Sequence, residues 1–143
     1  MKFRILGQLS QGNKALELSA WIESTNTGHR FPARILVDSG ASGMFIDRDF
    51  AEENGITLYR LESPIPVRNA DGSDNRGGPI KYDTDLWIET LAHRECARLE
   101  VTNLRRTQNV ILGYPWLQHH NPNIDWSAGT LVFDKCNPDH FRI

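Results

Sequence analysis

Hydrophobic and polar residues alternate along several short stretches of this chain, and that pattern predicts strands. The clearest rows are residues 16–22, 80–88 and 97–101, where alternation at period two places every second side chain against a core. Two further runs, 33–37 and 110–112, are mainly apolar and predict strands in the interior of a sheet. Turn residues separate these stretches, so the pattern predicts a mostly β chain.

Helix signals are few and short. Asp47 is placed to cap a short helix, which the Asn-Gly pair at 54–55 would end. Pro115 favours the first turn of a second helix, and the Asn-Pro pair at 121–122 would break it. We therefore expect one or two short helices.

Two segments predict hairpins or loops. Residues 123–126 and 130–133 flank Ser127-Ala128-Gly129, where glycine can take a positive φ. The stretch between Val67 and Ile80 is polar and rich in glycine, which is typical of a mobile hairpin between two strands.

The composition is that of an ordinary globular chain. Its 143 residues, 39% hydrophobic and 24% charged, suffice for one domain with its own core. The formal net charge is −2, without the clustered Lys and Arg of a nucleic-acid-binding surface, and no apolar stretch approaches the roughly 20 residues that span a bilayer. We expect neither a nucleic-acid nor a membrane partner. Two cysteines, Cys96 and Cys136, predict reduced thiols in an intracellular, cytoplasmic protein.

One position joins a buried strand to an acidic side chain. Asp38 follows the apolar residues 35–37, and Ser39 and Gly40 come directly after it. Gly40 has no side chain, so its N–H can approach the carboxylate, and the Ser39 hydroxyl can bond to backbone and hold the turn. Alone, Asp-Ser/Thr-Gly arises in roughly one chain in ten of this length, usually as an Asx turn after a strand. Context therefore decides whether Asp38 is catalytic.

That context resembles the retropepsins. Ala41 and Ser42 continue the turn, the glycine-rich loop follows, and about 70 residues after Asp38 comes 109–117, two apolar residues and a glycine before a predicted helix. Four segments look like the protease segment of Ty3/gypsy retrotransposon Pol polyproteins, namely residues 37–41, 66–73, 111–117 and 121–126. The resemblance covers a core of roughly residues 15–135 and implies an all-β, retropepsin-like acid-protease half-barrel, with 1–143 as a single domain.

The resemblance implies an aspartic endopeptidase that works as a homodimer. Pepsin-like enzymes carry two Asp-Ser/Thr-Gly turns in one chain, whereas this sequence has one, so a two-fold axis between two Asp38 carboxylates would complete the site. Two carboxylates that close share one proton and would activate a water to attack a peptide bond. No cofactor is implied. The implied polypeptide substrate is a Gag-Pol polyprotein, within retrotransposon particles.

The resemblance also implies roles for single residues. Asp38, Ser39 and Gly40 would form the catalytic turn, with Ser39 bonding across the dimer axis. Substrate contacts would come from the rest of the turn, a flap tip and a pocket wall, and the residues concerned are Ala41, Ser42, Ala70, Asp71, Gly72, Ser73 and Ile111.

Other interpretations of the same residues stay open. One is a retropepsin-like fold kept as a non-catalytic dimerisation or peptide-binding module, although that role would not require an aspartate at the axis. Another is a domesticated cellular protease with a different substrate. A metal site is not expected, because His119 and His120 are adjacent and Cys96 and Cys136 lack a Cys-x-x-Cys partner.

Overall fold

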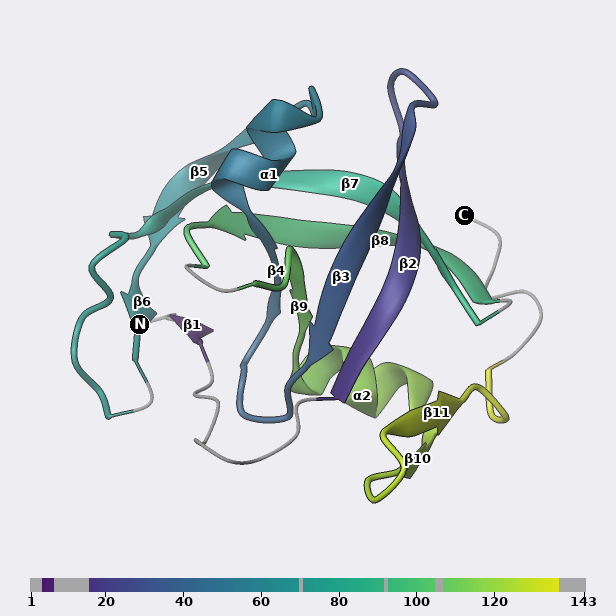
Figure 1. Ribbon diagram of the computed structural model, residues 1–143. Coiled ribbons are helices and arrows are strands. Elements are labelled where there is room, and N and C mark those ends of the chain that lie inside the picture. Colours follow the sequence, from purple (N-terminus) through teal and green to yellow (C-terminus); the bar gives the residue numbers. More distant parts are fainter. Residues whose placement is uncertain (1–3, 7–15, 70, 92, 105–106, 137–143) are drawn as a thin grey trace.

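The computed structural model describes residues 4–6, 16–69, 71–91, 93–104 and 107–136. The chain is mostly β with two short helices, as predicted (Figure 1). In chain order the elements are β1 (Arg4–Ile5), β2 (Leu16–Ser24), β3 (Arg30–Val37), β4 (Met44–Asp47), α1 (Arg48–Glu53), β5 (Tyr59–Ile65), β6 (Val67–Arg68), β7 (Ile80–Thr90), β8 (His93–Thr102), β9 (Val110–Leu112), α2 (Tyr114–His120), β10 (Asn123–Asp125) and β11 (Thr130–Val132).

The large sheet closes into a barrel within one chain. Its neighbours run β2-β3-β9-β4-β8-β7, and β7 pairs again with β2. Closure gives each of these six strands a partner on both sides. β5 pairs with the first residues of β7, on the edge that β2 takes further along. β3 pairs with β9 in parallel, so both strands end at the same rim of the barrel, which is where Asp38 and Gly113 follow them.

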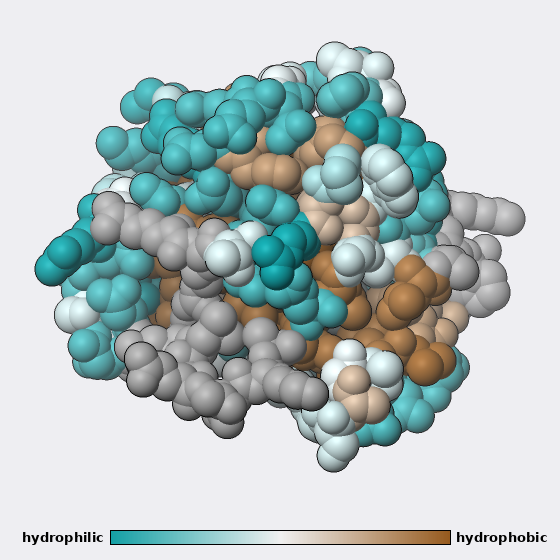
Figure 2. All heavy atoms as spheres, viewed as in Figure 1, coloured by the Kyte–Doolittle hydropathy of each residue, from teal (hydrophilic) through white to brown (hydrophobic). Residues whose placement is uncertain are grey.

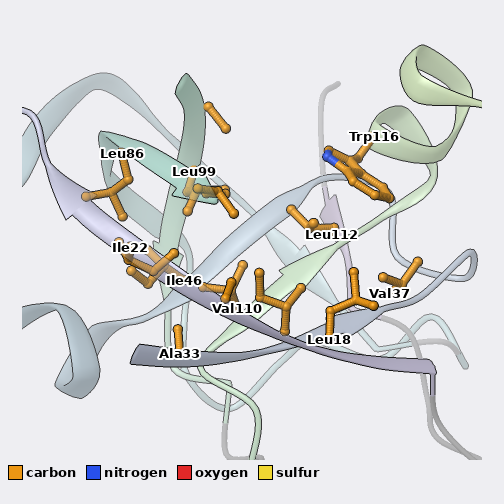
Figure 3. Packing of buried hydrophobic residues seen from close by; sticks show 14 of the residues in the cluster. Leu18, Ile22, Ala33, Val37, Ile46, Leu86, Leu99, Val110, Leu112 and Trp116 are labelled. Carbon is orange, nitrogen blue, oxygen red and sulfur yellow. The ribbon is translucent and has the colours of Figure 1, made fainter. Parts of the chain in front are cut away.

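The alternating rows predicted from sequence are confirmed. β2, β7 and β8 bury every second side chain along most of their length, and most of the apolar ones belong to the cluster inside the barrel. Figure 3 shows Ile22, Ile46 and Val110, from β2, β4 and β9, converging on this interior.

Three strands lie between two cores. In β3, β4 and β9, neighbouring side chains enter different clusters: Ile46 belongs to the barrel interior, whereas Phe45 belongs to a second cluster with Leu36 and Ile111. All four side chains are at most 1% exposed. Because both faces are packed, β4 shows no period-two pattern, and the sequence analysis did not predict it. β5 was also missed, because its side chains are mostly exposed and its ladder shifts register between Arg60 and Ile65.

Both helices form where their caps predict. The Asp47 carboxylate accepts the Phe50 N–H at 3.2 Å at the start of α1. α2 begins at Tyr114, one residue ahead of Pro115, and ends where Asn121 turns left-handed with φ of 42°. The buried Trp116 anchors α2 in the barrel core.

The predicted hairpin at the end of the described chain also forms. β10 and β11 pair antiparallel, and Gly129 takes φ of 70° in the turn between them.

The visible face of the molecule is unevenly polar. Figure 2 shows hydrophilic residues covering its upper part and hydrophobic residues reaching the surface lower down and to the right. Within the described ranges, no helix is both long enough and apolar enough to cross a membrane.

Candidate active site

Asp38 stands where β3 leaves the barrel. Its N–H donates to the Leu112 carbonyl at 3.0 Å, so the β3–β9 ladder continues up to this residue. The Gly40 N–H donates to Asp38 Oδ1 at 2.8 Å, and the Ala41 N–H donates to the Asp38 carbonyl at 3.1 Å. The close approach of Gly40 to the carboxylate, predicted from its missing side chain, is confirmed.

The second carboxylate oxygen of Asp38 has different surroundings. Oδ2 has less than 1 Å² of accessible surface, and no described residue hydrogen-bonds to it. Buried polar atoms in folded proteins nearly always have a partner. The described residues therefore give one carboxylate oxygen of Asp38 a hydrogen-bond partner and give the other none.

Gly113 braces the Asp38 turn from the neighbouring strand. Its N–H donates to the Gly43 carbonyl at 3.0 Å, and the next N–H, of Tyr114, donates to the Ala41 carbonyl at 2.8 Å. A Cβ at Gly113 would lie 2.3 Å from the Gly43 oxygen and 2.5 Å from the Ala41 oxygen. Two backbone segments thus pass so closely that a side chain has no room between them. This gives a physical role to the apolar-apolar-Gly segment seen in the sequence.

The N-terminal strand connects the turn to the polar hairpin. Ser42 Oγ accepts the Ile5 N–H at 2.8 Å, and the Ser42 N–H donates to the Ile5 carbonyl at 3.0 Å. On its other side β1 pairs in parallel with β6, Arg4 opposite Val67. Sequence reasoning missed this link, because two residues carry no periodicity. It assigned Ser42 to substrate, whereas the structure gives its hydroxyl a backbone bond; the substrate role stays a prediction.

The predicted flap forms a hydrogen-bonded hairpin. Arg68 bridges antiparallel to Asp74, the Asn69 N–H donates to the Ser73 carbonyl at 2.8 Å, and Gly72 takes φ of 89°. Asp71 Oδ1 accepts the Ser73 N–H at 2.9 Å and its hydroxyl at 2.6 Å, and the hydroxyl bond holds the pKa of Asp71 below its usual value. The turn thus falls within residues 69–73, and its role as the tip of a flap stays a prediction. Ala70, also assigned to the tip, lies outside the described residues.

In Figure 1 the hairpin lies at the lower left of the molecule, and the loop between β3 and β4, which carries Asp38, lies nearer the lower centre. The remaining site residues differ in exposure. Ser39 is exposed, and its hydroxyl has no bond to any described residue. Ala41 and Ile111 are 1% and 0% exposed and belong to the second core cluster, so their side chains offer no surface to a ligand here. Their substrate contacts stay predictions.

The architecture is similar to that of solved protease and protease-like domains. The structure is similar to the retroviral protease-like domain of Ddi1 from Leishmania major, with a TM-score of 0.55 and 17% identity over 82% of this chain and 86% of that chain. It is also similar to EIAV protease complexed with the inhibitor HBY-793, with a TM-score of 0.53 and 17% identity over 82% of this chain and 99% of that chain. The fold is therefore retropepsin-like, as predicted.

A family model gives a narrower assignment. The model of the PEG10/RTL1 protease domain matches residues 34–139. The chain belongs to this family of retropepsin-like protease domains.

Proposed function

We propose that this chain is an aspartic endopeptidase, and that it is active as a homodimer with one Asp38 from each copy. The observation that carries the proposal is the state of the Asp38 carboxylate. Gly40 fixes Oδ1 at 2.8 Å, while Oδ2 has no partner among the described residues. The terminal torsion of an aspartate is soft, so a small rotation can present Oδ2 to a group supplied by a second copy.

A second Asp38 is that group. Two carboxylates at hydrogen-bond distance cannot both carry full charge, so they share one proton and titrate as a pair. The ionised member takes a proton from a bound water, and the protonated member polarises the scissile carbonyl. Water then attacks the carbonyl carbon, and the amine leaves after its nitrogen is protonated.

Several features of the site support this scheme. Ser39 is exposed beside Asp38, where its hydroxyl can bond across a two-fold axis and fix the two turns together. The hairpin carrying Asp71, Gly72 and Ser73 is connected to the Asp38 turn through β1, which bonds to Ser42 on one side and pairs with β6 on the other. It can fold over an extended peptide and exclude water.

For the substrate we propose a Gag-Pol-type polyprotein processed in the cytoplasm. The support is the similarity of four segments to the Ty3/gypsy Pol protease, together with membership of the PEG10/RTL1 protease domain family. The peptide would bind largely as an added strand, main chain giving affinity and alternate pockets giving selectivity.

The test compares the parent with Asp38→Asn and with a matched control. Asp125→Asn is that control, because the Asp125 carboxylate also accepts a backbone N–H in an exposed turn, from Ala128 at 3.1 Å. A peptide library at mildly acidic pH, read by mass spectrometry, should show cleavage by the parent and by Asp125→Asn. Asp38→Asn should lose at least about a thousandfold, since it removes the general base.

Sedimentation at several concentrations tests the dimer. The parent and Asp38→Asn should both dimerise. Equal cleavage by Asp38→Asn and the parent would remove Asp38 from the mechanism, and a strictly monomeric, fully active chain would contradict the shared site. A dimer that binds peptides and cleaves none would favour the non-catalytic module.

A further inference from the structure

Away from the Asp38 turn, two histidines and a cysteine meet from three separate elements. His93 begins β8, His120 ends α2, and Cys136 follows β11. One possible ligand atom from each lies within 4.8 Å of the others. Both histidines are 2% exposed, and Cys136 is partly exposed.

The orientation of the His120 ring suits a metal ligand. His120 Nε2 lies 2.8 Å from Glu95 Oε2, and the other oxygen of Glu95 accepts the Trp116 indole N–H at 2.7 Å. An ionised carboxylate only accepts hydrogen bonds, so Nε2 carries the proton. In the tautomer with its single proton on Nε2, the Nδ1 lone pair faces Cys136 Sγ, which lies 3.2 Å away.

This arrangement is a recurrent one in metal sites. Histidines that bind zinc usually donate their other ring N–H to a carboxylate, which fixes the tautomer and the ring orientation. Glu95 occupies that position, and Trp116 holds it there. His93 is also fixed, since its ring stacks on Phe133 with the centroids 3.9 Å apart.

We propose that His93, His120 and Cys136 bind one Zn²⁺ ion per chain, with Glu95 orienting His120 and a water in the fourth position. Zinc prefers nitrogen and sulfur ligands in tetrahedral sites, with Zn–N of about 2.0–2.1 Å and Zn–S of about 2.3 Å. Ligand atoms in such a site lie roughly 3.3–3.6 Å apart, so a shift of about 1 Å closes the present arrangement. Binding displaces the Cys136 thiol proton to solvent.

The proposal reverses the expectation drawn from sequence. That expectation rested on the adjacency of His119 and His120 and on the lack of a Cys-x-x-Cys partner for Cys136, and it did not consider His93. The fold brings them together, and a bound ion would tie the segment after β11 to β8 and to α2.

The experiment uses the metal-stripped chain, Cys136→Ser, and Cys96→Ser as the matched control. Cys96 is the other free thiol, also partly exposed, and lies on β8 outside the cluster. Calorimetric titration with Zn²⁺ should give one site per parent chain and per Cys96→Ser chain. Cys136→Ser should bind about a hundredfold more weakly or worse. Zinc at a hundredfold excess over its Kd should raise the Tm of the parent by roughly 10 °C and leave that of Cys136→Ser nearly unchanged.

Cobalt gives a readout that is independent of whether the serine variant folds well. Co²⁺ should produce a thiolate-to-cobalt charge-transfer band with the parent and with Cys96→Ser. The proposal is overturned if the parent takes up no zinc at tens of micromolar, if no such band appears, or if Cys136→Ser binds as the parent does. Equal loss in both variants would also overturn it, because the site would then not be specific to Cys136.

Discussion

Gly113→Ala should disrupt the Asp38 turn more than any change of one methyl group elsewhere on the barrel rim. The φ of Gly113 is −91°, which any residue can adopt, so the backbone itself would accept alanine. The obstacle to alanine is steric overlap of its Cβ with neighbouring backbone. The new Cβ would lie 2.3 Å from the Gly43 oxygen and 2.5 Å from the Ala41 oxygen, and both oxygens belong to backbone that cannot rotate away.

The magnitude follows from those two contacts. Each oxygen must retreat by roughly 1 Å to reach ordinary contact distance, and overpacking of this kind costs about 1–3 kcal/mol. The retreat also stretches the bonds from the Gly113 and Tyr114 N–H groups, each worth about 0.5–1.5 kcal/mol. We expect a loss of about 4 kcal/mol, a large part of the 5–15 kcal/mol typical of a domain. For a chain of this size that lowers Tm by roughly 10–15 °C.

The control is Gly28→Ala in the β2–β3 turn. Gly28 has φ of 71°, and nothing lies within 4 Å of an added Cβ there. Alanine at a positive φ costs about 1 kcal/mol, so this variant tests backbone strain without contact. Thermal and urea unfolding of both variants and the parent give the comparison. If Gly113→Ala lost no more stability than Gly28→Ala, the close passage of the two backbone segments would not constrain the turn.

Two further changes test other parts of the structure. Asp47→Ala should cost about 2–3 kcal/mol in urea unfolding, since the carboxylate accepts the N–H groups of Phe50 at 3.2 Å and Leu104 at 3.0 Å. Asp47→Asn, with one acceptor left, should lose about half as much, and equal losses would argue against this double role. Glu17→Gln should lower Tm at neutral pH by roughly 1–3 °C, because the hydrogen bond from Arg34 lowers the pKa of Glu17 from its usual 4.5. A depressed pKa stabilises the fold above pH 4.5, and that contribution is lost as pH falls below it. Plots of Tm against pH for the variant and the parent should therefore converge in acid, and parallel plots would contradict the assignment.

The sequence predicted strands well where one face of a strand is packed. β2 and β7 show this, because burial on a single face imposes period two on the side chains. The same rule failed for β4, whose two faces enter two different cores, and for β5, whose side chains are mostly exposed.

The contacts of the candidate site also fall into two groups, those that the local sequence predicts and those that it does not. The Gly40 bond to Asp38 follows from three consecutive residues, so local chemistry could predict it. The Gly113 contact and the Ser42 bond to Ile5 join residues that are distant in sequence, and so does the His93, His120 and Cys136 cluster. Contacts of that kind depend on how the barrel closes, and no local pattern specifies them.

β1 lies between two segments of the candidate site and connects them by backbone hydrogen bonds. Ile5 holds Ser42 on one side, while Arg4 and Leu6 bond to the carbonyls of Pro66 and Arg68 on the other. Loss of these few residues would remove one brace from the Asp38 turn and one from the hairpin between β6 and β7 at the same time. A change in the position of β1 would therefore alter both segments.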